Sequence, residues 1–62
     1  MRVKQFAKKI SKHLSKDDFA KLGTFEDIKD LIKSYGGDTE MINSITAENW
    51  EEISNIIIDE LI

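Results

Sequence analysis

Residues 2–16 of the chain read RVKQFAKKISKHLSK, and their apolar residues recur at intervals of three and four. That spacing is the period of one helix face, and at about 100° per residue the apolar side chains fall within an arc of roughly 100°. The residues of this stripe are Val3, Phe6, Ala7, Ile10 and Leu14. Every other residue from position 2 to position 16 is polar. The pattern predicts an amphipathic helix over about residues 2–15.

Two further stretches of the chain show the same period. The first is predicted to be a helix over about residues 25–35, with Thr24 as its N-cap and Gly36-Gly37 at its end. Its apolar stripe consists of Phe25, Ile28, Leu31, Ile32 and Tyr35. The second is predicted over about residues 47–61, after an N-cap at Thr46. Its apolar stripe consists of Ala47, Trp50, Ile53, Ile57 and Leu61.

Two short helical turns are expected between these helices, over about residues 16–22 and 39–44. Ser15 followed by Asp18 is a weaker form of the capping box, and Gly23 is expected to end the first turn in the left-handed conformation. Asp38 is expected to cap the second turn. The predicted fold class is therefore all-α, a small bundle of three principal helices with two short helical turns between them.

Length and composition limit what the chain can be. Its 62 residues are expected to form a single helical domain over residues 1–62, and a chain of this length buries only about 60 % of the surface that its unfolded form exposes. The absence of cysteine excludes disulfides, thiolate metal sites and cysteine catalysis. No apolar run approaches the roughly 18 residues of a membrane-spanning helix, and the first residues do not resemble a secretory signal. We therefore expect a cytoplasmic protein with no membrane segment.

Charge is unevenly distributed along the chain, whose net charge is −3. Residues 1–16 contain no acid and six bases, which we call the basic face: Arg2, Lys4, Lys8, Lys9, Lys12 and Lys16. Residues 34–62 contain no base and seven acids. Either these segments pack together within the chain, or the basic face binds an acidic protein, a nucleic acid or an anionic membrane surface. Since a lysine-rich helix face is most often solvated or paired within its own chain, the first interpretation is favoured.

The sequence carries no set of residues typical of an enzyme or a cofactor site. Adjacent carboxylates such as Glu51 and Glu52 diverge by about 100° on a helix and do not share a site. His13 has no second histidine four residues on with which to hold a metal. Residues 26–33 contain no Arg, Asn or Gln to read base edges, so a helix–turn–helix reader of DNA is not expected. We expect no enzymatic activity, no cofactor and no metal.

The last predicted helix has more apolar surface than its main stripe. Ile56 points away from the stripe, while Ile58 and Ile62 widen it on the far side. Either the shorter segments wrap around this helix and cover it, or the helix offers apolar area to another molecule. In the second case the predicted interface consists of Ile56, Ile58, Ile62, Trp50 and Tyr35, with the two aromatic residues as anchors.

These observations predict a non-enzymatic, cytoplasmic protein-interaction module. We expect a small inhibitor or adaptor that covers a surface of a partner protein, or of a second copy in a homodimer. Isoleucine outnumbers leucine ten to four and lysine outnumbers arginine eight to one, which is typical of AT-rich genomes and suggests a low-GC bacterium, phage or plasmid as the source. One alternative is a nucleic-acid-binding accessory protein that uses the basic face, and another is a structural homo-oligomer building block.

Overall fold

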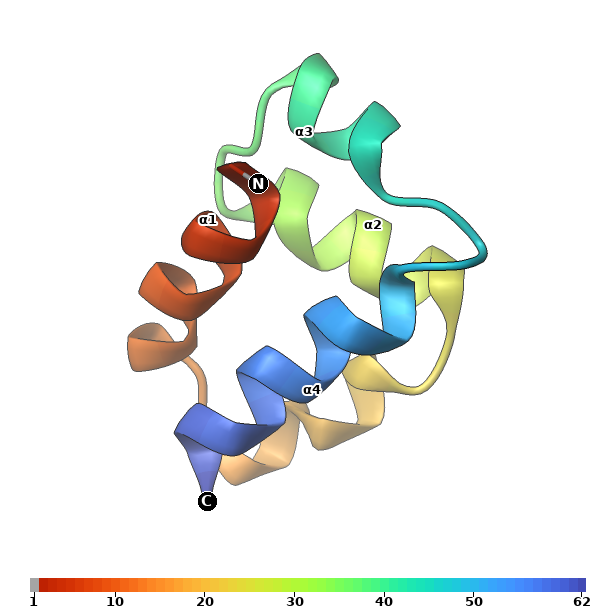
Figure 1. Ribbon diagram of the computed structural model, residues 1–62. Coiled ribbons are helices and arrows are strands. Elements are labelled where there is room, and N and C mark those ends of the chain that lie inside the picture. The colour runs from red at the N-terminus through yellow and green to blue at the C-terminus, as the bar shows by residue number, and fades with distance from the viewer. Residues whose placement is uncertain (1) are drawn as a thin grey trace.

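The computed structural model describes residues 2–62, and all the regular structure in that range is helical (Figure 1). The α-helices are α1 (Arg2–Ile10), α2 (Phe25–Ser34), α3 (Thr39–Ser44) and α4 (Trp50–Leu61). Two 3₁₀ helices, η1 (Ser11–His13) and η2 (Lys16–Leu22), connect α1 to α2. The prediction of an all-α bundle with short helical segments between its principal helices is confirmed.

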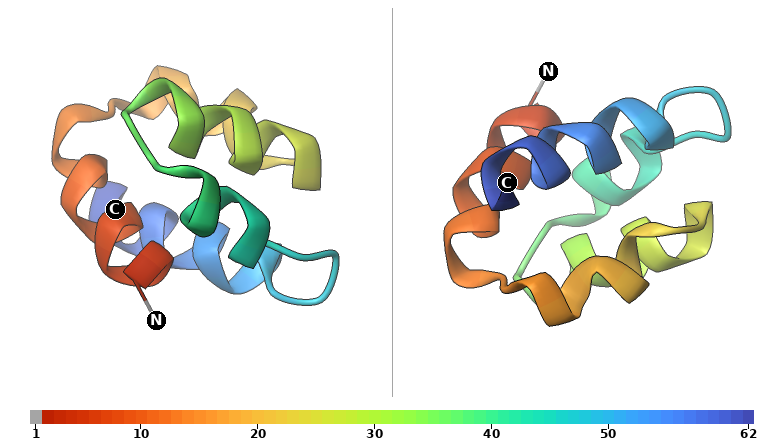
Figure 2. Two further views of the ribbon diagram at one scale, coloured as in Figure 1. Left: turned by 90° about the horizontal axis from the view of Figure 1, so that it is seen from above. Right: turned by 90° about the horizontal axis from the view of Figure 1, so that it is seen from below.

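Helix α4 is the element against which most of the others pack. It contacts α1, η1, α2 and η2, while α3 contacts α1 and α2. The chain from α1 to α2 loops past the C-terminal end of α4 (Figure 2). The two 3₁₀ helices therefore cover part of α4, as one of the two interpretations of its broad apolar surface requires.

Most of the buried core comes from the apolar stripes that the sequence predicts, and Leu22 and Ile45, which lie outside those stripes, also belong to it. Among residues 2–62, six apolar residues have no exposed surface, namely Val3, Ala7, Ile28, Ile32, Ile53 and Ile57. Half-buried side chains, including those of Phe6, Leu14 and Trp50, pack against this core. Ala47, which the sequence places on the last stripe, is instead exposed.

Helix α1 ends earlier than the sequence predicts. The α-helix stops at Ile10, and Leu14 has an extended backbone with φ −98° and ψ 158°. The Ser11 hydroxyl donates a 2.6 Å hydrogen bond to the carbonyl of Lys8, which stabilises the tightened last turn. The predicted helix over residues 2–15 is therefore wrong at its C-terminal end, and the break allows η2 to pack against α4.

Helix α4 begins at Trp50, later than the predicted residue 47. Residues 47–49 form a turn in which the Thr46 N–H donates to Asn49 Oδ1 at 2.7 Å and the Asn49 N–H donates to Thr46 Oγ1 at 3.2 Å. Asn49 Nδ2 also donates to the carbonyl of Ser44 at 2.8 Å. Thr46 thus caps the turn that leads into α4, but the side chain of Asn49 ties that turn to the end of α3 and delays the regular helix.

The predicted N-caps of α2 and α3 are confirmed. Thr24 Oγ1 accepts a hydrogen bond from the N–H of Asp27 at 3.1 Å. Asp38 Oδ1 accepts one from the N–H of Met41 at 2.8 Å. Each contact satisfies one of the amide groups that the first turn of a helix leaves without an intrahelical partner.

The two ends of η2 differ in how well they were predicted. At its start, a carboxylate oxygen of Asp18 accepts a 2.9 Å hydrogen bond from the N–H of Ser15, as in a capping box. At its end, Gly23 has φ −92° and ψ −11°, so the predicted left-handed conformation is wrong. No left-handed residue is needed here, because Thr24 follows directly as the N-cap of α2.

The double glycine ends α2 as predicted. The N–H of Gly36 donates to the carbonyl of Lys33 at 3.1 Å, and the N–H of Gly37 donates to the carbonyl of Ile32 at 2.9 Å. Gly36 has φ +90°, in the left-handed region that favours glycine. This pair of bonds is the Schellman ending of a helix, and it turns the chain toward α3.

One buried hydrogen bond links α4 to η2. Ser54 is 4 % exposed, and its hydroxyl donates to the carbonyl of Leu22 at 2.9 Å. That carbonyl lies at the end of η2, where helix carbonyls have no partner in their own helix. Ser54 therefore satisfies a buried acceptor, a role that the apolar stripes of the sequence do not reveal.

Candidate functional site

The five residues of the predicted apolar interface lie in separate places. Ile56 and Ile58 are half-buried and diverge by about 160° around α4, so they face different flanks of the helix. Ile62 is 91 % exposed at the end of α4, four residues after Ile58. Trp50 is half-buried against the core, and Tyr35 lies beyond the end of α2. The structure therefore does not join all five into one surface.

Ile56 instead lies with residues of the basic face. A groove of about 360 Å³ runs between α1 and α4 and is lined by Lys4, Gln5, Lys8, Ile56, Asp59 and Glu60. Its α1 wall is basic and its α4 wall is acidic, and Ile56 is its apolar residue. We call this feature the α1–α4 groove. It unites residues that the sequence assigned to two competing hypotheses, an apolar interface and a basic face.

Gln5, Asp59 and Glu60 were not among the predicted site residues. Ile56, Asp59 and Glu60 are three and four residues apart, so the sequence does place them on neighbouring positions of one helix surface. Nothing local, however, indicates that α1 lies beside that surface. The pairing of α1 with α4 is the missing information.

The two ends of the groove differ in how their charges are paired. Lys4 Nζ lies 2.6 Å from Glu52 Oε2, and the hydrogen bond that Lys4 donates lowers the pKa of Glu52 from its ordinary value. Lys8, Asp59 and Glu60 form no ion pair within residues 2–62. The groove therefore offers one cation and two carboxylates to a molecule that enters it.

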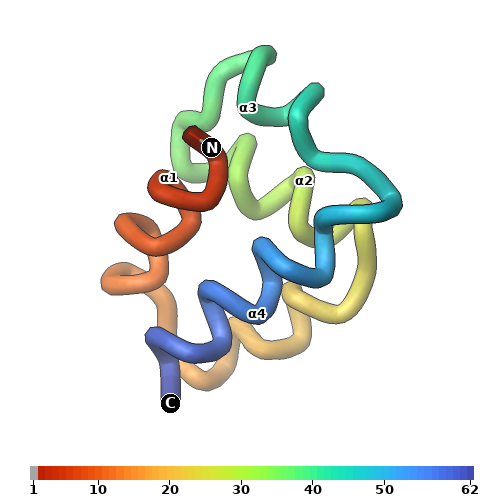
Figure 3. Tube along the Cα trace, viewed as in Figure 1, coloured from red at the N-terminus to blue at the C-terminus, as the bar shows by residue number. Residues whose placement is uncertain are grey.

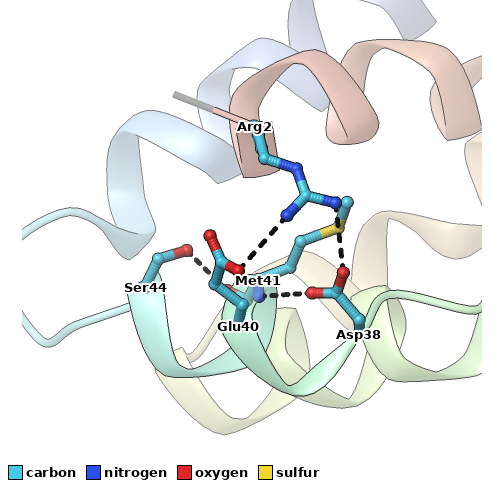
Figure 4. Close-up of polar contacts among 5 residues, drawn as sticks. All are labelled: Arg2, Asp38, Glu40, Met41 and Ser44. Carbon is cyan, nitrogen blue, oxygen red and sulfur yellow. Dashed lines mark hydrogen bonds and ion pairs between the residues drawn. The ribbon is translucent and has the colours of Figure 1, made fainter.

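Arg2, at the start of the basic face, is also paired within the chain. Its guanidinium lies 3.1 Å from Asp38 Oδ2 and 3.4 Å from Glu40 Oε2, and it joins α1 to the start of α3 (Figure 4). The N–H of Met41, followed by the charge of Arg2, lowers the pKa of Asp38. Arg2 and Lys4 thus follow the intramolecular interpretation of the charge pattern.

The remaining members of the basic face make no ion pair in the described part of the chain. They are Lys8, Lys9, Lys12 and Lys16. Lys9, Lys12 and Lys16 are exposed and lie outside the groove. Only Lys8 belongs to both the basic face and the unpaired part of the groove.

We expect the protein to lose stability below about pH 4, where ordinary carboxyl groups protonate. The pKa values of Asp18, Asp38 and Glu52 are lowered in the folded chain, by the N–H of Ser15, the N–H of Met41 and the ammonium of Lys4 respectively. The unfolded chain therefore binds more protons at acidic pH, and the stabilisation present above that pH is lost as pH falls through the lowered values.

Urea unfolding followed by circular dichroism between pH 7 and pH 2.5 measures this loss. Glu52→Gln should make the midpoint less sensitive to acid, because it removes one of the three carboxylates with a lowered pKa. Glu51→Gln is the control, since Glu51 is exposed and forms no ion pair within residues 2–62. A midpoint that does not fall at low pH contradicts the prediction.

A second cavity, of about 460 Å³, lies between η2 and α2. It is lined by Asp18, Lys21, Asp27, Asp30, Leu31, Ser34 and Tyr35. The carboxylate of Asp18 already accepts a hydrogen bond from the N–H of Ser15 and lies 3.6 Å from Lys21 Nζ.

Within residues 2–62 no three His, Cys, Asp or Glu side chains are grouped so that they could hold a metal ion. In the same range, no helix combines the length and the apolar character needed to cross a membrane.

Comparison of the chain with family models, with curated proteins and with solved structures gives no significant match.

Proposed function

We propose that the chain is a protein-interaction module that takes a segment of a partner protein into the α1–α4 groove. The observation that carries this proposal is that Ile56, half-buried on α4, lines a groove together with Lys4 and Lys8 of α1 and Asp59 and Glu60 of α4. Protein–protein contacts usually combine apolar residues with polar or charged ones in this way. The partner segment that fits presents an apolar side chain to Ile56, an acidic group to Lys8 and a basic group to Asp59 or Glu60.

The acidic wall favours a protein over a nucleic acid as the partner. A phosphate that approaches Lys8 meets Asp59 and Glu60 on the other side of the groove, and one that approaches Lys4 meets Glu52, its ion-pair partner. Protein surfaces that bind nucleic acid attract its phosphates with a positive electrostatic potential, and these carboxylates weaken such a potential. A protein segment that turns an acidic group toward the basic wall and a basic group toward the acidic wall is repelled by neither.

A module of this kind acts by occupation rather than by chemistry. By covering a surface of its partner it works as an inhibitor, and by holding two molecules together it works as an adaptor. We propose a cytoplasmic, non-enzymatic role of this sort. Electrostatic steering by the unpaired Lys8, Asp59 and Glu60 gives the association a rate that falls with added salt.

Site-specific photo-crosslinking tests the proposal. A benzophenone side chain at the exposed position Gln5, on the groove, should form adducts with a protein in extracts of the source cells, whereas one at the exposed position Asn43 on α3 should not. Ile56→Glu should abolish the Gln5 adduct, because it replaces an apolar residue of the groove lining with a charged one. Equal adducts at Gln5 and Asn43 would contradict the proposal.

Ile58→Glu is the matched control for Ile56→Glu. Both residues are half-buried on α4 and pack against the core, but only Ile56 lines the groove. Ile58→Glu should keep the adduct, and its loss would move the binding surface to the other flank of α4. Circular dichroism checks that each variant folds. If Ile56→Glu unfolds the chain, Lys8→Glu tests the same groove from an exposed position.

A further inference from the structure

We infer that the α1–α4 groove is covered by the same surface of a second copy, so that the chain is a twofold homodimer. This inference rests on the proposed function and names its partner. The charge pattern of the groove carries it. Each copy presents Lys8 on one wall and Asp59 and Glu60 on the other, with Ile56 as the apolar residue of the lining.

A twofold axis that runs along the groove makes this surface complementary to itself. Rotation by 180° about such an axis exchanges left and right, so the basic wall of one copy faces the acidic wall of the other. A twofold axis across the groove would instead place like charges opposite each other. In an isologous interface every contact occurs twice, so one favourable pairing of walls gives two.

The positions of the charges along the axis of the groove also match. Helices α1 and α4 run in the same general direction (Figure 3), because Lys4 pairs with Glu52 near their starts and Lys8 lies beside residues 56–60 further on. Rotation about an axis along the groove leaves the position of each residue along that axis unchanged. Lys8 of one copy therefore lies opposite Asp59 and Glu60 of the second copy, and Ile56 on α4 faces α1 of the second copy.

The dimer satisfies groups that a single copy leaves without partners. Lys8, Asp59 and Glu60 form no ion pair within residues 2–62, and the side chain of Ile56 is only half-buried. Domains of this size without disulfides or metals commonly gain stability by self-association. Opposite charges on facing walls also set the register in which the two copies dock.

Charge reversal on one wall at a time tests the inference. Sedimentation equilibrium should show a dimer for the wild-type chain. Lys8→Glu alone and the double variant Asp59→Lys, Glu60→Lys should each raise the dimer dissociation constant by about a hundredfold or more, because the twofold axis makes every reversal act twice.

An equimolar mixture of the two reversed chains gives the decisive result. In the mixed dimer Glu at position 8 of one chain faces Lys at positions 59 and 60 of the other, and the second contact is that of the wild type. The mixture should therefore form a heterodimer although neither chain dimerises alone. Lys9→Glu is the control, because Lys9 is an exposed lysine of α1 outside the groove, and it should leave the dimer intact.

Three outcomes overturn the inference. The first is a wild-type chain that stays monomeric at hundreds of micromolar, and the second is a dimer that Lys8→Glu does not weaken more than Lys9→Glu does. The third is a mixture of reversed chains that stays monomeric although the wild type dimerises. If a monomeric chain still forms the Gln5 adduct with a different protein, the inference fails and the proposed function stands. If Gln5 forms adducts with neither a second copy nor another protein, both fail.

Discussion

We expect Ile53→Ala to lower the free energy of unfolding by about 2–5 kcal/mol, the usual cost of truncating a buried isoleucine. Ile53 has no exposed surface and lies on α4, which packs against α1, η1, α2 and η2. A cavity at this point is surrounded by several elements, so no single one of them can move to fill it. A domain of this length has about 3–9 kcal/mol of stability in total, so a large fraction of the variant should be unfolded.

Urea denaturation followed by circular dichroism measures this effect at one fixed protein concentration. Ile62→Ala is the control, because it makes the same substitution at the end of the same helix on a side chain that is 91 % exposed. We expect that variant to unfold at nearly the wild-type midpoint. A similar loss in both variants would mean that Ile53 does not lie in the core that the structure describes.

Gly37→Ala should lower the free energy of unfolding by about 1–3 kcal/mol, as expected for an atom forced into a filled space. A Cβ at position 37 would overlap the side chain of Ile32 and lie 2.9 Å from its carbonyl oxygen. That oxygen accepts the hydrogen bond from the N–H of Gly37, so it cannot move away without weakening the end of α2. The backbone between α2 and α3 must shift instead.

Gly23→Ala is the matched control for Gly37→Ala. Within residues 2–62, a Cβ at position 23 meets no atom within 4 Å other than those of its own chain neighbours, and the φ of Gly23 is −92°. Alanine fits this conformation and reduces the freedom of the unfolded chain, so we expect a gain of about 0.4–1 kcal/mol. The opposite signs of the two glycine substitutions would be seen in thermal unfolding curves. A loss of stability at position 23 equal to that at position 37 would contradict this account.

The helices were predictable where the signals are local. The stripe from Val3 to Ile10 and the caps at Thr24 and Asp38 depend on residues within one or two turns of each other. The same holds for the end of α2 at Gly36, whose positive φ favours glycine. In each case the sequence contains both partners of the interaction within a few positions.

The errors occur where tertiary contacts override a local pattern. Leu14 continues the first stripe in sequence, yet the helix breaks before it and the chain turns so that η2 can reach α4. Ala47 begins the last stripe in sequence, but the side chain of Asn49 donates a hydrogen bond to the carbonyl of Ser44 and the regular helix starts only at Trp50. A periodic pattern does not show whether the residues at its two ends lie within the regular helix.

The sequence predicted several residues of the candidate site but not that they lie together. Lys4, Lys8 and Ile56 were all named from the sequence, but as members of different hypotheses. Arg2 pairs with Asp38 and Lys4 pairs with Glu52. The segregation of bases and acids along the sequence indicated that such pairs could form within the chain. Which lysine would remain without a partner beside Ile56 depends on the register of α1 against α4, and no local signal specifies that register.

The sequence by itself determined which segments are helical, which side of each is apolar and where most of them begin, because periodicity, capping and glycine conformation act over a few residues. Only the tertiary structure decided that α1 lies along α4 in the same direction, and with it which charges pair and which line a groove. The physical reason is that burial of apolar stripes is non-directional. The order of packing is set by the breaks at residues 11–15 and 47–49 and by contacts between residues nearly fifty positions apart, such as Lys4 and Glu52.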